Sequence, residues 1–159
     1  MKPIPAIRII LLLLPVLLLT NLSAQTERVI ILEVNTTDIE NPNVNDFCNF
    51  QGQDPQVSNE DYTVEANLGD TIIWRGVSTS SPDHTVEIRA INHQGNRGGR
   101  DIFGSNKLSG ENGEVRGTII NRTEAGTDYK YKIQFRVYID GSRKRGTFNI
   151  DPKIRVVGQ

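Results

Sequence analysis

The side chains that most often carry redox or metal chemistry are scarce in this chain of 159 residues. Its cysteine is Cys48, its histidines are His84 and His93, and its one methionine is Met1. His84 and His93 stand at opposite ends of a predicted strand, which separates them by about 25–30 Å. A metal site needs three or four converging ligands, so both histidines are interpreted as structural or solvated groups. We therefore expect no metal centre, and His84 is only a weak candidate ligand.

A hydrolytic site would need a nucleophile and a base in contact. Ser80 and Ser81 precede Asp83 and His84, a set that contains the residue types of a catalytic triad. Neighbouring residues on a strand point to opposite faces, so Asp83 is badly placed to orient His84. The chain also lacks the Gly-x-Ser-x-Gly turn of many hydrolases. The sequence predicts no catalytic residue, and we expect that the protein is not an enzyme.

Cys48 lies between Phe47 and Phe50, close to Asp46. A thiol in such apolar surroundings commonly packs as a small hydrophobic group. The alternatives are an intermolecular disulfide, since a single cysteine has no partner in its own chain, or a reactive thiol. Acidic neighbours disfavour the thiolate that both reactions require. We favour buried packing, and both alternatives stay open.

Two segments could bind ions. Gly95–Arg100 could hold an anion with backbone N–H groups and two arginines, but no helix or Lys-Ser/Thr pair follows, as it would in a phosphate-binding loop. We favour a plain surface loop there. Asn35–Asp61 carries six acids and no Lys or Arg, and its oxygens would suit calcium. The acids do not follow the EF-hand spacing, so calcium stays an open alternative.

Alternation of apolar and polar residues predicts many short strands. In Asp128–Ile139, every second residue from Tyr129 faces one way, and Lys130 begins the opposite, polar face. The pair Asn112-Gly113 predicts a tight turn. Residues 35–61 are expected to form a long acidic loop or insertion, with short structure only around residues 47–50. Further strands are predicted at 28–34, 62–66, 71–74, 84–91, 115–120, 147–150 and 153–157, with loops at 76–83, 92–100 and 140–146.

Two details of these strands concern the core. Trp74, at the end of strand 71–74, is expected to be the residue that anchors the core. Strand 84–91 is expected to alternate without interruption, so that Ala90 shares the face of Ile88 and Ile91 takes the opposite face. No amphipathic helix longer than two turns is evident, and many short strands with regular turns predict an all-β sandwich.

The N-terminus has the layout of a secretory signal peptide. Two basic residues precede the apolar run Ile9–Leu19, and small residues stand before the expected cleavage point after Ala24. The run is shorter than the about 20 apolar residues that span a bilayer, although an uncleaved anchor is the alternative. We expect removal of residues 1–24, leaving one domain over residues 25–159 that is secreted or periplasmic and has no membrane association.

Charge is unevenly distributed along the mature chain. Residues 25–88 hold 12 acids and two basic residues, whereas residues 89–159 hold 14 basic residues and seven acids. Such halves could bind partners by charge. A sandwich that mixes early and late strands would instead pair the two halves with each other, and we favour this internal pairing.

Several motifs in the second part of the chain resemble the cupredoxin family. They are Tyr62-Thr63-Val64, the stretch from Gly69-Asp70 to Trp74, Asp83-His84-Thr85-Val86, and the strands near 129–132 and 154–157. The resemblance covers residues 62–157 and implies a Greek-key β-sandwich. It also implies that His84 opens a strand at the position of the family's first copper ligand.

The remaining type 1 copper ligands are missing. The family places a Cys, a second His and usually a Met on its last hairpin loop, whereas residues 139–146 here read Ile-Asp-Gly-Ser-Arg-Lys-Arg-Gly. A thiolate selects and tunes copper in such sites, and three adjacent cations would repel it. The resemblance thus implies the fold without the electron-transfer activity, and we expect no cofactor. The alternative is a degenerate copper-binding or electron-transfer protein that uses His84 with unusual ligands.

The preferred function is an exported, non-catalytic binding or interaction module. The resemblance implies that His84 lies at the same end of the sandwich as the basic residues Arg143, Lys144 and Arg145. These four residues are the candidate binding site, and the expected partner is anionic, such as a polysaccharide, a phosphate-bearing envelope component or an acidic protein. A solvated hairpin tip without a partner is the competing interpretation. We expect no nucleic-acid partner.

Overall fold

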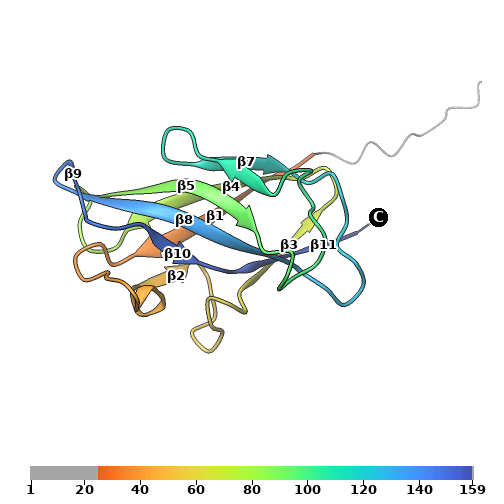
Figure 1. Cartoon of the computed structure of the whole chain (residues 1–159), viewed down its shortest axis with the longest axis horizontal. Helices are drawn as coiled ribbons and strands as arrows, with labels where there is room; N and C mark the ends of the chain where they lie inside the picture. Colours follow the sequence, from red (N-terminus) through yellow and green to blue (C-terminus); the bar gives the residue numbers. More distant parts are fainter. Residues whose placement is uncertain (1–24, 159) are drawn as a thin grey trace, which may run out of the picture.

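The computed structural model describes residues 25–158, which form a β-sandwich of two sheets around one hydrophobic core (Figure 1). The all-β prediction is therefore confirmed. The predicted signal peptide, residues 1–24, lies outside the described residues. The elements are β1 (Glu27–Val34), a 3-10 helix η1 (Val44–Phe47), β2 (Cys48–Phe50), β3 (Thr63–Asn67), β4 (Thr71–Ser78), β5 (Thr85–His93), β6 (Lys107–Ser109), β7 (Val115–Thr118), β8 (Tyr129–Ile139), β9 (Ser142–Arg143), β10 (Phe148–Ile150) and β11 (Lys153–Val157).

The first sheet has the strand order β2-β1-β4-β7. β1 and β4 are parallel and pair along their whole length, from Glu27 opposite Thr71 to Val34 opposite Ser78. The prediction that this strand ends at Trp74 is wrong, because β1 offers backbone partners as far as Ser78. Gly76 lies within β4, where a Cβ atom would stand only 2.3 Å from Val86 Cγ1. The close approach of β5 to β4 therefore requires glycine at this position.

The second sheet has the order β3-β11-β8-β5-β6, and β9 and β10 also pair with β8. β8 is its longest strand, and its alternation is confirmed: Tyr129 and every second residue as far as Val137 are buried in the core. Lys130 departs from the expected pattern, since it lies on the other face of the strand and is nevertheless buried. The two parallel pairs, β1 with β4 and β3 with β11, each join distant parts of the chain.

A β-bulge at Arg89 corrects the predicted faces of β5. Ile88 stands opposite Phe135, and Ala90 stands opposite Gln134. Two residues of β5 are therefore passed for one of β8, so Arg89 is an extra residue in the strand. The extra residue shifts the alternation by one position. As a result Ile91, expected on the outer face, is fully buried in the core.

The long segment 35–61 is irregular as predicted, with short structure only in η1 and β2. It nevertheless packs on the core, since Ile39, Val44 and Phe50 are buried. The predicted turn is also present: Asn112 and Gly113 have φ values of 51° and 83°. Positive φ at both central residues is typical of the two-residue hairpin turn.

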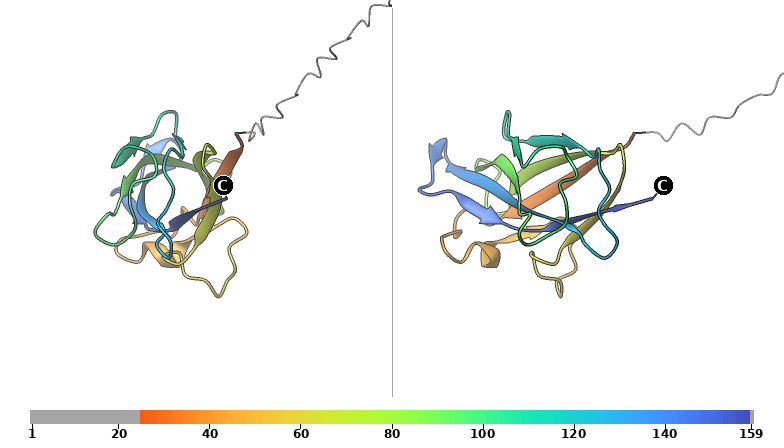
Figure 2. Two further views of the ribbon diagram at one scale, coloured as in Figure 1. Left: turned by 90° about the vertical axis from the view of Figure 1, so that its right-hand side faces the viewer. Right: turned by 45° about the vertical axis from the view of Figure 1, so that its right-hand side comes forward.

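The two halves of the chain neutralise each other. Cross-half ion pairs join Arg97 to Glu60, Arg116 to Glu27 and Lys153 to Asp61. The internal pairing favoured from the charge distribution is therefore confirmed. The β9 hairpin forms one end of the elongated body, while the start of β1 and the end of β11 lie toward the opposite end (Figures 1 and 2).

Candidate functional site

The end of the sandwich that carries β9 holds the residues singled out from the sequence. His84 immediately precedes β5, and its Nδ1 lies 2.7 Å from the hydroxyl oxygen of Thr36. The same hydroxyl lies 2.7 Å from the hydroxyl of Ser78, at the end of β4. Thr36 is fully buried, so a hydroxyl pair beneath the surface holds the imidazole.

The β8–β9 hairpin brings the basic residues to the same end. Tyr138 pairs with Thr85 on one side and with Arg143 on the other. Lys144 Nζ donates hydrogen bonds to the carbonyl oxygens of Thr36 and Thr37, at 3.2 and 2.7 Å. His84 and Lys144 therefore contact the same buried threonine from two elements. The sequence does not predict this contact, because a threonine in an irregular segment carries no pattern that places it beside a histidine.

The two arginines of the hairpin are exposed and unneutralised. Arg143 donates to the carbonyl oxygen of Gly146 at 3.1 Å, and Arg145 extends from the surface. Among residues 25–158, no carboxylate forms an ion pair with Arg143, Lys144 or Arg145. Two backbone carbonyl groups engage the amine of Lys144, so the exposed positive charge of this hairpin comes from Arg143 and Arg145.

These residues do not fit a type 1 copper centre. Thr36 engages Nδ1 of His84, and the neighbouring hairpin supplies cations in place of sulfur or imidazole ligands. Cys48 lies on β2, two strands away from β4, which corresponds to about 10 Å. In the part of the chain that the structure describes, no three His, Cys, Asp or Glu side chains converge as metal ligands would.

His93, at the far end of β5, anchors the glycine-rich loop. Its Nε2 lies 2.7 Å from the carbonyl oxygen of Gly99, and its ring stacks on Tyr129 at 4.8 Å. Gly98 passes so close to β8 that a Cβ atom would stand 2.3 Å from Lys130 Cβ. Arg97, one of the two arginines proposed to hold an anion, instead pairs with a carboxylate of the protein.

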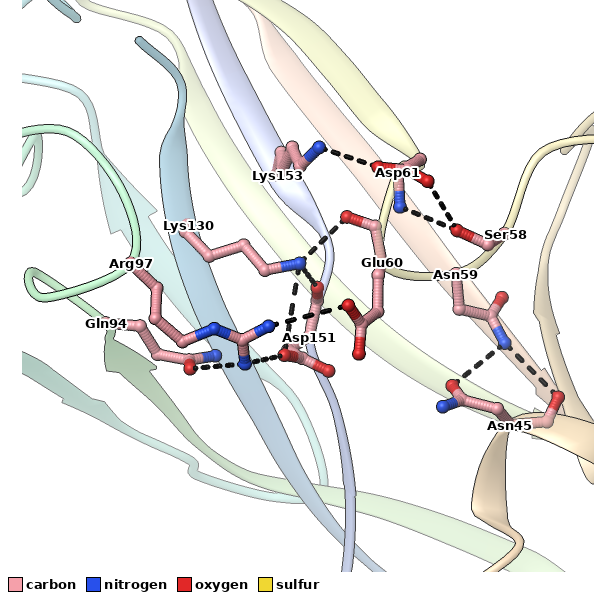
Figure 3. A network of polar contacts seen from close by, with 10 residues as sticks. All are labelled: Asn45, Ser58, Asn59, Glu60, Asp61, Gln94, Arg97, Lys130, Asp151 and Lys153. Atoms are coloured by element: carbon pink, nitrogen blue, oxygen red, sulfur yellow. Dashed lines mark hydrogen bonds and ion pairs between the residues drawn. The ribbon is translucent and has the colours of Figure 1, made fainter.

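Lys130 is the centre of a polar network that the sequence did not reveal (Figure 3). Its Nζ donates to the carbonyl oxygen of Glu60 at 2.8 Å and to that of Asp151. Burial lowers the pKa of Lys130, although the nearby Asp151 and Glu60 favour the charged amine. Arg97 adds a 2.7 Å ion pair to Asp151 and a longer one to Glu60. A lysine on the polar face of an alternating strand is normally exposed to solvent. The sequence pattern therefore gave no sign that Lys130 is buried.

This network holds one end of the wall of a groove of about 670 Å³ beside the outer edge of β2. That wall is formed by the segment 53–60, and Asn45, Cys48 and Asn49 also line the groove. Cys48 lines the groove, and burial raises the pKa of its thiol to about 12. The preference for a buried, unreactive thiol agrees with this position.

Neither a protein family nor a curated protein matches this chain in sequence. Among residues 25–158, no helix has the length and apolar character needed to cross a lipid bilayer. The functional assignment consequently depends on the chemistry of the described side chains.

Proposed function

We propose that this chain is an exported, non-catalytic binding module of cupredoxin-like, Greek-key arrangement that contacts an anionic partner through Arg143 and Arg145, beside His84. The observation that carries the proposal is the pair of exposed guanidinium groups without carboxylate partners. Most other arginines of the described chain are paired with Asp or Glu. Phosphate, sulfate and carboxylate groups are the natural partners of such a pair.

The order of the elements supports the cupredoxin-like arrangement. The Gly69-Asp70 turn leads into β4, which carries the buried Trp74, and His84 follows a loop and immediately precedes β5. β8 and β11, the strands compared with the family's last hairpin, are neighbours in one sheet. Each sheet also mixes early and late strands, as Greek-key connections do.

The geometry around His84 supports a non-catalytic role. Its Nδ1 is engaged by Thr36, and Asp83 is exposed beside it. Ser80 donates its hydroxyl proton to Asn35 Oδ1 at 2.7 Å, so this hydroxyl serves the loop. The hydroxyl in contact with the imidazole of His84 is that of Thr36, which is fully buried and therefore out of reach of a substrate that a nucleophile would attack.

Export is part of the proposal and rests on the pattern of residues 1–24. Expression with this segment in a secreting host should yield a protein whose N-terminal residue is Gln25. Recovery of a form that retains Leu11–Leu19 would contradict export by cleavage.

The anionic partner is tested by elution from a dextran sulfate column with a salt gradient. Salt elutes the protein because exposed charge contacts are screened over about 8 Å at physiological ionic strength. The double variant Arg143→Ser/Arg145→Ser has lost two of these contacts and should therefore elute at clearly lower salt. Lys107→Ser/Lys132→Ser is the matched control, since both lysines are exposed and both stand beside Asn92 in the sheet. Equal losses in the two variants would mean that only overall charge matters, and the localised site would be abandoned.

Titration with Cu(II) tests the degenerate copper protein that remains the alternative. The mature chain should give no intense blue thiolate absorption, because the hairpin offers no sulfur. A stoichiometric blue band that vanishes in Cys48→Ser would favour the alternative.

A further inference from the structure

The groove beside β2 has the size and the stable walls of a ligand site. Its volume of about 670 Å³ lies within the range of small-molecule and short-peptide sites. Two hydrogen bonds join Gln53 to Phe50. The backbone N–H of Gln53 donates to the carbonyl oxygen of Phe50 at 3.0 Å, and the backbone N–H of Phe50 donates to Gln53 Oε1 at 2.8 Å. At the other end of the wall, Lys130 holds the carbonyl oxygen of Glu60. The groove is therefore formed before any ligand arrives.

Three of the four side-chain amides that line the groove already donate hydrogen bonds to the protein. Asn59 Nδ2 donates to the carbonyl oxygen of Cys48 at 2.9 Å, and Gln53 Nε2 donates to that of Val57 at 2.7 Å. Asn49 Nδ2 donates to Glu33 at 2.6 Å. What these side chains leave for a ligand is mainly oxygen.

An acceptor in the wall has no donor. Asn59 lines the groove and is 8% exposed, and within the described residues its Oδ1 accepts no hydrogen bond. Exchanging the amide atoms would turn Oδ1 toward the carbonyl oxygen of Cys48, so the orientation is determined by its surroundings. A buried acceptor without a partner is costly, and a ligand donor would remove that cost.

The charge of the groove is negative, which also favours a ligand that donates hydrogen bonds. Asp54 and Glu60 line it, and no Lys or Arg does. Asp54 accepts a hydrogen bond from the backbone N–H of Gln56 but has no cation partner among residues 25–158. Glu60 reaches Arg97 only at 3.5 Å. Val57 and Pro55 add apolar surface for a methylene chain.

We propose that this groove binds a ligand carrying a protonated amine or guanidinium group, whose methylene stem lies on Val57 and Pro55 while its N–H donors meet Asp54 and Asn59. A neutral sugar fits less well, because a hydroxyl both donates and accepts while the groove offers mainly acceptors. This site is independent of the basic end of the sandwich, which takes ligands of the opposite charge.

The test uses NMR titration of the mature chain with three probes: spermine, a short peptide that contains Lys and Arg, and the neutral trisaccharide maltotriose. We expect saturable shifts of backbone amides within residues 45–60 for at least one amine probe and none for maltotriose. Binding by spermine identifies free polyamines as the source of the amine, and binding by the peptide alone identifies a protein segment. Binding of maltotriose alone would overturn the proposal.

Charge reversal supplies the second arm. Asp54→Lys should weaken amine binding about tenfold or more, since a lost ion pair and a new repulsion together exceed about 1.4 kcal/mol. Asp83→Lys is the matched control, because Asp83 is exposed and does not line the groove, and its effect should stay below about twofold. Equal weakening by both variants, or shifts spread over all acidic residues, would show attraction by general charge and overturn the proposal. Spectra of each variant without ligand confirm that it is folded.

Discussion

The indole Nε1–H of Trp74 donates a hydrogen bond of 3.1 Å to the phenol oxygen of Tyr131 in the buried core. Trp74 belongs to β4 in the first sheet and Tyr131 to β8 in the second, so this bond crosses the sandwich. The rings also meet edge to face, with centroids 5.7 Å apart. Burial raises the pKa of Tyr131 far above its ordinary value, so the phenol stays neutral and in place.

Removal of this phenol should destabilise the fold. Tyr131→Phe leaves the buried indole N–H without an acceptor, and the expected loss in the free energy of unfolding is about 1–3 kcal/mol. Urea unfolding measures it, with Tyr138→Phe as the control. Tyr138 is only half-buried on the outer face of β8, so its variant should change stability by less than about 0.5 kcal/mol. Equal stabilities would show that the cross-sheet bond contributes little.

Asp70 should make stability depend on pH in the acid range. Burial alone would raise the pKa of this carboxyl, but Arg28 at 2.7 Å and the backbone N–H groups of Asn67 and Thr26 lower it below 3.8. The unfolded chain thus takes up the proton at higher pH, so this contribution is present above about pH 4 and is lost as the pH falls below it.

Asp70→Asn tests this dependence. At pH 7 the variant should lose about 1–3 kcal/mol, because the amide cannot satisfy all three donors. Between pH 4 and pH 2.5 its stability should fall less steeply than that of the unchanged chain, as measured by urea midpoints. Parallel pH profiles would show that other carboxyl groups govern acid unfolding.

Lys130→Met should loosen the wall of the groove. The substitution fills a similar volume but leaves the carbonyl oxygens of Glu60 and Asp151 without their donor. Hydrogen exchange should accelerate at the amides of Asp61 and Tyr62, which bond to Ser58 within this segment. Lys132→Met, on the exposed surface of the same strand, should leave these rates unchanged. If the amides of Asp61 and Tyr62 stay protected from exchange in Lys130→Met, contacts other than those of Lys130 hold this segment in place.

Cys48 should be nearly inert in the folded protein. Burial raises the pKa of the thiol from 9.0 to about 12, so the thiolate fraction at pH 8 falls roughly a thousandfold. Alkylation by iodoacetamide should be slow in the native chain and rapid in 6 M guanidinium chloride. Rapid labelling of the native chain would indicate a reactive thiol, and disulfide-linked dimers on non-reducing gels would indicate an intermolecular disulfide.

Local pattern was enough to predict most of the strands. The alternation of β8 and the Asn112-Gly113 turn depend on neighbouring residues only, and both are observed. The all-β sandwich followed from the number and spacing of such segments. The irregular character of residues 35–61 was likewise evident from their Asn, Asp, Gly and Pro content.

Other features depend on partners far away in the sequence. β4 extends to Ser78 because β1 lies beside it, and the bulge at Arg89 arises in the pairing of β5 with β8. Lys130 is buried because residues 60 and 151 fold over it. Thr36 contacts His84 only after both loops meet at one end of the sandwich. No single segment contains the information for these contacts.

The position of β11 has a consequence for the time at which the protein can fold. β11 lies between β3 and β8, so the second sheet stays divided until β11 has been synthesised. Its parallel partner β3 was synthesised about 90 residues earlier, and such distant pairings form slowly. A chain that lacks β11 therefore holds β3 apart from the other strands of this sheet, and closure of the second sheet depends on this one strand.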